Sequence, residues 1–142
     1  MINVGIIGCG FVGGALKDWL EHNNPECKLF ISDPAKGYND SMADIDIAFL
    51  PIHVPTEDDG TQDLSLMKQL ISALPDVPVF VRTTILPGTS DLLSRETGHR
   101  VHYMPEFLTE RTTSRTSRSR PWCSQELMSF SQRSSWARSS PL

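Results

Sequence analysis

The segment Gly8-Cys9-Gly10-Phe11-Val12-Gly13 is the most informative part of this 142-residue chain. The apolar, β-branched run of residues 2–7 comes directly before it and predicts a short buried strand. After it, apolar residues recur at helical spacing and predict a helix that ends near residue 22, the recurring positions being Val12, Ala15, Leu16, Trp19 and Leu20. The spacing of the glycines indicates a ligand site only when a strand precedes the turn and a helix follows it, as predicted here.

The spacing of Gly8, Gly10 and Gly13 matches the pattern G-x-G-x-x-G. In such a turn the first glycine allows a tight bend, the second lets a pyrophosphate approach the backbone, and the third lets the helix pack closely on the strand. The N-terminus of the helix offers unpaired N–H groups and a partial positive charge to the phosphates. The turn therefore predicts a dinucleotide site.

An acid, Asp33, follows the second predicted strand, residues 28–32, and lies 20 residues after Gly13. Its carboxylate can accept hydrogen bonds from a ribose diol, and its charge would repel a 2′-phosphate, so the sequence favours NAD over NADP. The alternative is a glycine-rich turn of an unrelated α/β fold, in which Asp33 only caps a loop.

Strand-like and helix-like segments alternate along the rest of the chain. Asp63 is the predicted N-cap of a helix whose apolar stripe comprises Leu64, Met67, Leu70, Ile71 and Leu74. Residues 34–40 are predicted to form a loop and residues 88–97 a short helix, and further strands are expected at residues 45–52, 79–83 and 101–104. This alternation predicts an α/β fold, a Rossmann-like, doubly wound, mainly parallel sheet of about five strands with helices on both faces.

Charge is distributed unevenly along a chain whose formal net charge is -4. Residues 1–112 hold eight basic and sixteen acidic residues, whereas residues 113–142 hold five arginines, one acid and ten serines. We therefore predict an NAD-binding domain at residues 1–112 and a disordered or irregular Ser/Arg-rich C-terminal segment at residues 113–142. A basic arm for nucleic acid is the less favoured alternative, because the segment has no lysine and the acidic body argues against a nucleic-acid partner.

Several classes of protein do not fit this sequence. No apolar run approaches the ~18 residues of a membrane helix, and the N-terminus lacks the pattern of a signal peptide. Three scattered cysteines do not suit a disulfide framework or a zinc cluster, so we expect no metal site. Reduced thiols and a cytoplasmic location are the corresponding expectation.

Hydroxyl and carboxylate side chains follow the last two predicted strands. Thr84 comes after the strand at 79–83, and Glu106 and Glu110 come after the strand at 101–104. Ligands of open α/β sheets bind outside the carboxyl ends of the strands, where such groups can act as general acids or bases. The alternatives are that Thr84 is an ordinary β-branched strand residue and that the two glutamates are acids at the start of a helix.

Motifs within residues 1 to about 112 resemble the N-terminal half of the UDP-glucose/GDP-mannose dehydrogenase family. In chain order they are the glycine-rich turn with Asp33, Asp63-Leu64-Ser65, Thr83-Thr84-Ile85 with Gly88-Thr89, and Pro105-Glu106-Phe107-Leu108 with Glu110. This family oxidises the C6 hydroxymethyl group of a nucleotide sugar to a carboxylate with two NAD. The resemblance implies an NAD-dependent oxidoreductase, a nucleotide-sugar substrate and a full-length family that can form oligomers.

The resemblance also implies roles for individual residues. Thr84 corresponds to a threonine near the catalytic water and the nicotinamide, Glu106 to an acid/base in thioester hydrolysis, and Glu110 to a carboxylate beside the substrate. The implied cofactor-binding residues are Gly8, Gly10, Phe11, Val12, Gly13, Asp33, Pro55 and Thr84.

The chain departs from the family in several places. Residues 52–55, Ile-His-Val-Pro, replace the family's V-x-T-P, Arg111 stands in place of a glycine, and nothing after about residue 113 matches. The family's nucleophilic cysteine comes much later, and Cys123 lies in no matching motif. We therefore expect this chain to bind NAD without turning over a UDP-sugar by itself. The rival interpretations are another NAD-linked dehydrogenase, such as a hydroxyacid or prephenate type, and a non-catalytic NAD-binding fragment.

Two stretches of the chain differ in length or content from the family. The stretch between Asp33 and Ile45 is short, because the family usually has a longer helical excursion and an extra strand there. For the segment after residue 112, one hypothesis is an out-of-frame translation, since motif-bearing sequence changes abruptly to serine and arginine. The coding DNA tests it, because a single-base shift near codon 112 should restore the family's continuation.

Overall fold

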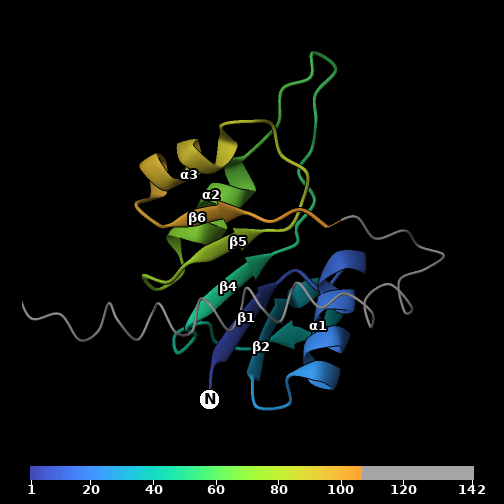
Figure 1. The fold of residues 1–142 in the computed structure, drawn as a ribbon. Helices are drawn as coiled ribbons and strands as arrows, with labels where there is room; N and C mark the ends of the chain where they lie inside the picture. The colour runs from blue at the N-terminus through green and yellow to red at the C-terminus, as the bar shows by residue number, and fades with distance from the viewer. Residues whose placement is uncertain (107–142) are drawn as a thin grey trace, which may run out of the picture.

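In the computed structural model, residues 1–106 are described, and they form one sheet with helices on both faces (Figure 1). Three predictions lie outside these residues: Glu110, the boundary at residue 112 and the Ser/Arg-rich C-terminal segment at residues 113–142. No helix in the described part is long and apolar enough to cross a membrane.

The sheet has six strands in the order β3-β2-β1-β4-β5-β6. Their bounds are β1 Asn3–Ile7, β2 Lys28–Asp33, β3 Tyr38–Asn39, β4 Ile47–Leu50, β5 Val79–Val81 and β6 Val101–Tyr103. Every pairing is parallel except that of β2 with β3, which is antiparallel. The predicted Rossmann-like, mainly parallel sheet is therefore confirmed. The chain runs outward from β1 to β2 on one side and reaches β4 on the other, so the strand order reverses beside β1, where such folds bind ligands.

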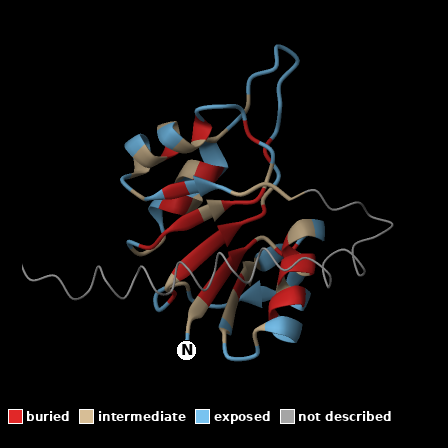
Figure 2. Cartoon of the chain, viewed as in Figure 1, coloured by how far each residue is buried: buried red, intermediate tan, exposed pale blue. Residues whose placement is uncertain are grey.

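The hydrophobic core occupies both faces of the sheet, because successive side chains of a strand point to opposite faces. One face packs against α1 (Phe11–Asn23) through Val4, Ile6, Leu16, Trp19, Leu20, Ile47 and Phe49. The other face packs against α2 (Ser65–Ser72) and α3 (Thr89–Thr97) through a cluster that includes Ala48, Leu50, Met67, Ile71, Val79, Val81 and Leu93. Figure 2 shows these buried residues along the central strands and the inward sides of the helices.

A short loop takes the place of a helix between β2 and β4. Residues 40–46 cross β1 at Gly5, where a Cβ atom would lie 2.8 Å from Cδ1 of Ile45 and 3.1 Å from Sδ of Met42. The absence of a side chain at Gly5 therefore lets Met42 and Ile45 cover this face of the sheet directly. This close approach explains how the short stretch after Asp33 closes the sheet without a helical excursion.

The prediction of a loop at residues 34–40 was wrong in part. The three-residue 3-10 helix η1 (Pro34–Lys36) is followed by Gly37 in the left-handed region, at φ 81°, and then by the edge strand β3. Asp40 holds the returning chain on β2, because its N–H donates to the Ile31 carbonyl at 3.0 Å and its Oδ2 accepts from the Ile31 N–H at 2.8 Å. A two-residue strand is too short to produce a period-2 pattern in the sequence.

Asp63 was predicted as the N-cap of α2, but the helix begins at Ser65 with Leu64 at the N-cap position. The Asp63 carboxylate nevertheless accepts a hydrogen bond from the Ser65 N–H at 2.9 Å. The predicted acceptor is therefore correct, and the helix starts one residue later than predicted. The predicted apolar stripe is confirmed as the packing face of α2, with Met67 and Ile71 buried in the core.

Candidate functional site

The glycine-rich turn joins the end of β1 to the start of α1. Gly8 adopts φ 100°, which an L side chain rarely adopts, and its N–H donates to the Ser32 carbonyl of β2 at 2.8 Å. A Cβ at Gly13 would lie 2.0 Å from the Gly8 carbonyl oxygen, so only glycine fits where the helix meets the turn. These two glycines hold the turn in the geometry that the spacing predicted.

Gly10 has a different environment from the other two glycines of the turn. A Cβ there would have no heavy atom within 4 Å among the described residues. Gly10 is also the N-cap residue of α1, and no side chain of residues 1–106 caps this helix end. The first N–H groups of α1, beginning with Phe11 and Val12, therefore have no side-chain cap, and the backbone next to them at Gly10 is open, as an anion-binding helix end requires.

Asp33 points at the glycine-rich turn. Its Oδ2 accepts a hydrogen bond from the Cys9 N–H at 2.7 Å, which leaves Oδ1 for another donor. Sequence reasoning missed Lys36, whose Nζ donates to the Cys9 carbonyl at 2.6 Å. No sequence spacing predicts this contact, because it depends on how η1 turns the chain back toward β1.

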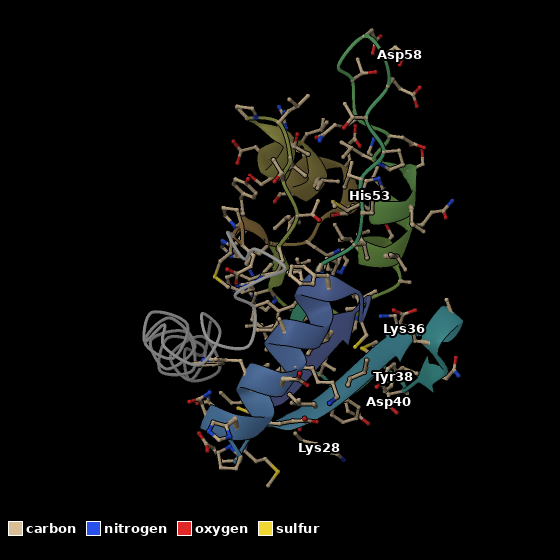
Figure 3. The ribbon with its side chains drawn as sticks, turned by 90° about the vertical axis from the view of Figure 1, so that its right-hand side faces the viewer. Lys28, Lys36, Tyr38, Asp40, His53 and Asp58 are labelled. Atoms are coloured by element: carbon tan, nitrogen blue, oxygen red, sulfur yellow. The ribbon has the colours of Figure 1, made fainter. Side chains whose placement is uncertain are left out.

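Pro55 lies at the base of a hairpin that follows β4. Its carbonyl accepts from the Asp63 N–H at 3.0 Å, and Thr56 pairs with Gln62 in an isolated antiparallel bridge. The hairpin projects from the body of the molecule, with Asp58 at its tip and His53 below its base (Figure 3). Pro55 and His53 are both exposed.

Thr84 lies in the turn after β5, and its side chain is exposed. It therefore does not belong to the strand, contrary to the alternative that the sequence left open. Gln62, which sequence reasoning missed, holds this turn: its Nε2 donates to the Thr84 carbonyl at 3.2 Å and its Oε1 accepts from the Leu86 N–H at 3.0 Å. The turn that carries Thr84 is thus joined to the hairpin after β4.

Glu106 forms an ion pair with Arg82. Arg82 follows β5 and Glu106 follows β6, so the ion pair joins the ends of these two neighbouring strands. Both side chains are almost completely buried, with exposed fractions of 2% for Arg82 and 8% for Glu106. Sequence reasoning missed Arg82. Its signal was an arginine directly after a buried strand, since a buried arginine nearly always has an ionic partner.

The structure places the predicted residues in two groups along the carboxyl edge of the sheet. The first is the glycine-rich turn with Asp33. The second follows β5 and β6, where Thr84 is joined to Gln62 and Glu106 to Arg82. Ile52 contacts both groups. The Ile52 carbonyl accepts a hydrogen bond from Thr83 Oγ1 at 2.6 Å, and Ile52 Cγ2 would lie 3.0 Å from a Cβ at Gly8. Within residues 1–106, no three His, Cys, Asp or Glu side chains are arranged to hold a metal ion.

Together, the strand order, the glycine-rich turn and the acid that ends β2 define the class of Rossmann-like domains. Within that class, the chain is similar to solved dehydrogenase structures. A GDP-mannose dehydrogenase from Pseudomonas aeruginosa, solved as a ternary complex, matches this chain with a TM-score of 0.58 and 20% sequence identity. The match covers 78% of this chain and 37% of the dehydrogenase chain. A UDP-glucose dehydrogenase from the hyperthermophilic archaeon Pyrobaculum islandicum has a TM-score of 0.61 and 20% identity, with the same coverage.

The fold is shared more widely than with these two proteins. An imine reductase from Myxococcus stipitatus, a V8 variant in complex with NAD+, has a TM-score of 0.55 and 16% identity, over 79% of this chain and 43% of its own. At these identities the likeness establishes the fold alone. The chain spans less than half the length of each of these proteins. No protein-family profile and no curated protein matches the sequence.

Proposed function

We propose that this chain binds NAD at the turn between β1 and α1. It would be the NAD-binding part of a cytoplasmic oxidoreductase that oxidises a nucleotide sugar. The observation that carries the proposal is the open backbone at Gly10, beside the uncapped N-terminus of α1 and within reach of Asp33. A pyrophosphate would accept hydrogen bonds from the N–H groups of α1, and its charge would be stabilised by the helix dipole.

Asp33 supplies the second half of the cofactor site. Because Oδ2 is taken by the Cys9 N–H, Oδ1 is the oxygen that would accept from the ribose diol. The same bond fixes the orientation of the carboxylate before any ligand arrives. Pro55 and Thr84 would lie toward the nicotinamide end, since they follow β4 and β5 at the same edge of the sheet.

The substrate side of the proposal rests on the motif Pro105-Glu106-Phe107-Leu108 with Glu110. Bound NAD would supply the hydride acceptor, and the chain's own groups would orient the substrate and move protons. Arg82 holds the Glu106 carboxylate at the end of β6, which supports a fixed position for this proposed acid/base group. Thr84 presents an exposed hydroxyl at the end of β5, which suits the proposed placing of a water molecule near the nicotinamide.

The second candidate is an NAD-linked oxidoreductase with another kind of substrate. The likeness to an imine reductase in complex with NAD+ favours it, because the fold alone does not separate the two. The candidates differ in the substrate that would reduce NAD, so NADH formation with UDP-glucose, GDP-mannose, an amine (the reduced partner of an imine) and a hydroxy acid distinguishes them.

The NAD site is tested by calorimetric titration of the folded chain and two matched variants. Gly10→Ala puts a methyl group where the pyrophosphate would approach, whereas Gly14→Ala puts one into equally open space on the next turn of α1. We expect the unmodified chain and Gly14→Ala to bind NAD and Gly10→Ala to lose binding while remaining folded. Absence of NAD binding by the folded, unmodified chain would contradict the proposal.

A further inference from the structure

Lys36 and Asp33 both form hydrogen bonds with the backbone of Cys9 in the glycine-rich turn. The Lys36 ammonium donates to the Cys9 carbonyl at 2.6 Å, and the Asp33 carboxylate accepts from the Cys9 N–H at 2.7 Å. The two side chains lie three positions apart, at the end of β2 and in η1. A positive and a negative charge therefore meet at one residue of the proposed cofactor site.

In the described part of the chain, no carboxylate oxygen lies within 4.0 Å of the Lys36 ammonium. The ion pairs within 4.0 Å there are Lys17–Asp18, Lys17–Glu21, Lys68–Glu96 and Arg82–Glu106. The contact of Lys36 is a neutral carbonyl, which uses one of the three N–H donors of an ammonium group. Lys36 is also exposed, so the remaining donors are open to an anion from solution.

We infer that Lys36 lets this site accept a phosphate on the 2′-oxygen of the adenosine ribose, so that NADP is a second cofactor. The inference rests on the proposed NAD site, in which Asp33 binds the ribose diol. Asp33 repels a 2′-phosphate, but Lys36 lies beside the same residue and attracts it. Because the lysine stem is flexible, its ammonium can turn from the Cys9 carbonyl to the phosphate. The site would then bind NAD more tightly than NADP but would still bind NADP.

The inference is tested by calorimetric titration of the folded chain with NAD and with NADP. Lys36→Met keeps most of the stem and removes the charge, so we expect the ratio of the NADP Kd to the NAD Kd to rise about tenfold, the value of one hydrogen bond to a charged group. Lys36→Arg should keep the original ratio. The matched control is Lys28→Met, which removes an exposed lysine at the opposite end of β2 (Figure 3) and should leave the ratio unchanged.

Asp33→Asn gives an independent measurement, since the amide oxygen still accepts from the Cys9 N–H while the repulsive charge is gone. We expect this variant to lower the ratio of the NADP Kd to the NAD Kd. If Lys36→Met leaves the ratio unchanged, or if NADP does not bind a chain that binds NAD, the inference is wrong. If neither dinucleotide binds the folded chain, the proposed NAD site itself is wrong.

Discussion

The guanidinium of Arg82 lies against the carboxylate of Glu106, and the pair is buried where β5 and β6 end. Arg82 also donates its backbone N–H to the Leu50 carbonyl at 3.1 Å, so it is tied to β4 as well. The ion pair and the hydrogen bond from the Met104 N–H to the Val81 carbonyl at 2.9 Å both hold the chain after β6 at the carboxyl edge of the sheet. The ion pair also places a residue that the sequence suggested as an acid/base group beside a permanent positive charge.

Removing one member of this pair should destabilise the fold strongly. Arg82→Ala or Glu106→Ala would each leave a buried charge without its ionic partner, at a cost of about 3–5 kcal/mol. Urea unfolding measures the effect, with Lys68→Ala as the control, because the Lys68–Glu96 pair is exposed and contributes only about 0–1 kcal/mol. The double variant Arg82→Ala/Glu106→Ala should lose less stability than the two single variants together, because it leaves neither charge buried alone. Additive losses would show that the two side chains do not act as a pair.

Gly13 and Gly14 should respond in opposite directions to the same substitution. Gly13→Ala forces a methyl group against the Gly8 carbonyl, so we expect a loss of about 3 kcal/mol or more and loss of NAD binding. Gly14→Ala meets no neighbour and should raise the free energy of unfolding by about 0.5–1 kcal/mol, since alanine favours the helix. Thermal unfolding with and without NAD compares them. Equal stability of the two variants would be inconsistent with the close packing at Gly13.

Gly5 should tolerate a methyl group only if Ile45 becomes smaller. Gly5→Ala pushes on Cδ1 of Ile45, and we expect a loss of about 1–3 kcal/mol from overpacking. Ile45→Val removes that atom and alone should cost about 0.5–1.5 kcal/mol. In a double-mutant cycle by urea unfolding, the combined variant should be more stable than the sum of the single losses predicts. A combined variant that loses the full sum would show that the loop does not rest on Gly5.

His102 should make the fold less stable in mild acid. Its ring stacks on Phe80 with centroids 5.0 Å apart. Although the residue is exposed overall, partial desolvation of the ring, together with the charge of Arg100, lowers the pKa of His102. The unfolded chain then binds the proton more readily, so stability falls as the pH drops below the ordinary histidine pKa of about 6.5. His102→Phe keeps a ring on Phe80 and does not titrate. Urea unfolding at about pH 7.5 and about pH 5.5 should show a smaller loss for His102→Phe, and parallel losses would refute the prediction.

Much of the fold follows from local patterns in the sequence. The β-branched run before Gly8, the helical spacing after it and the stripe on α2 each concern neighbours in the chain, and each predicted its element. The errors occur where the pattern is too short or where a boundary depends on a single hydrogen bond. The strand β3 has two residues, and the start of α2 differs by one position from the predicted N-cap.

In the candidate site, too, local features were predicted from the sequence and contacts between distant residues were not. The spacing of the glycines and of Asp33 predicted the turn, because the properties of glycine and the order of strand and helix are local. The sequence did not predict Lys36, Gln62 or Arg82 as parts of the site. Each of them contacts a partner more than 20 residues away in the chain.

Local sequence patterns were enough to predict most of the strands and helices, the turn between β1 and α1, and the acid that ends β2. These features depend on backbone conformation and on the periodicity of apolar side chains, which a few consecutive residues encode. The contact of Lys36 with the Cys9 carbonyl, the packing of Ile45 on Gly5 and the pairing of Arg82 with Glu106 depend on the three-dimensional fold. Such contacts form when the sheet brings distant segments to one edge, and no pattern within a single segment specifies which side chains meet there.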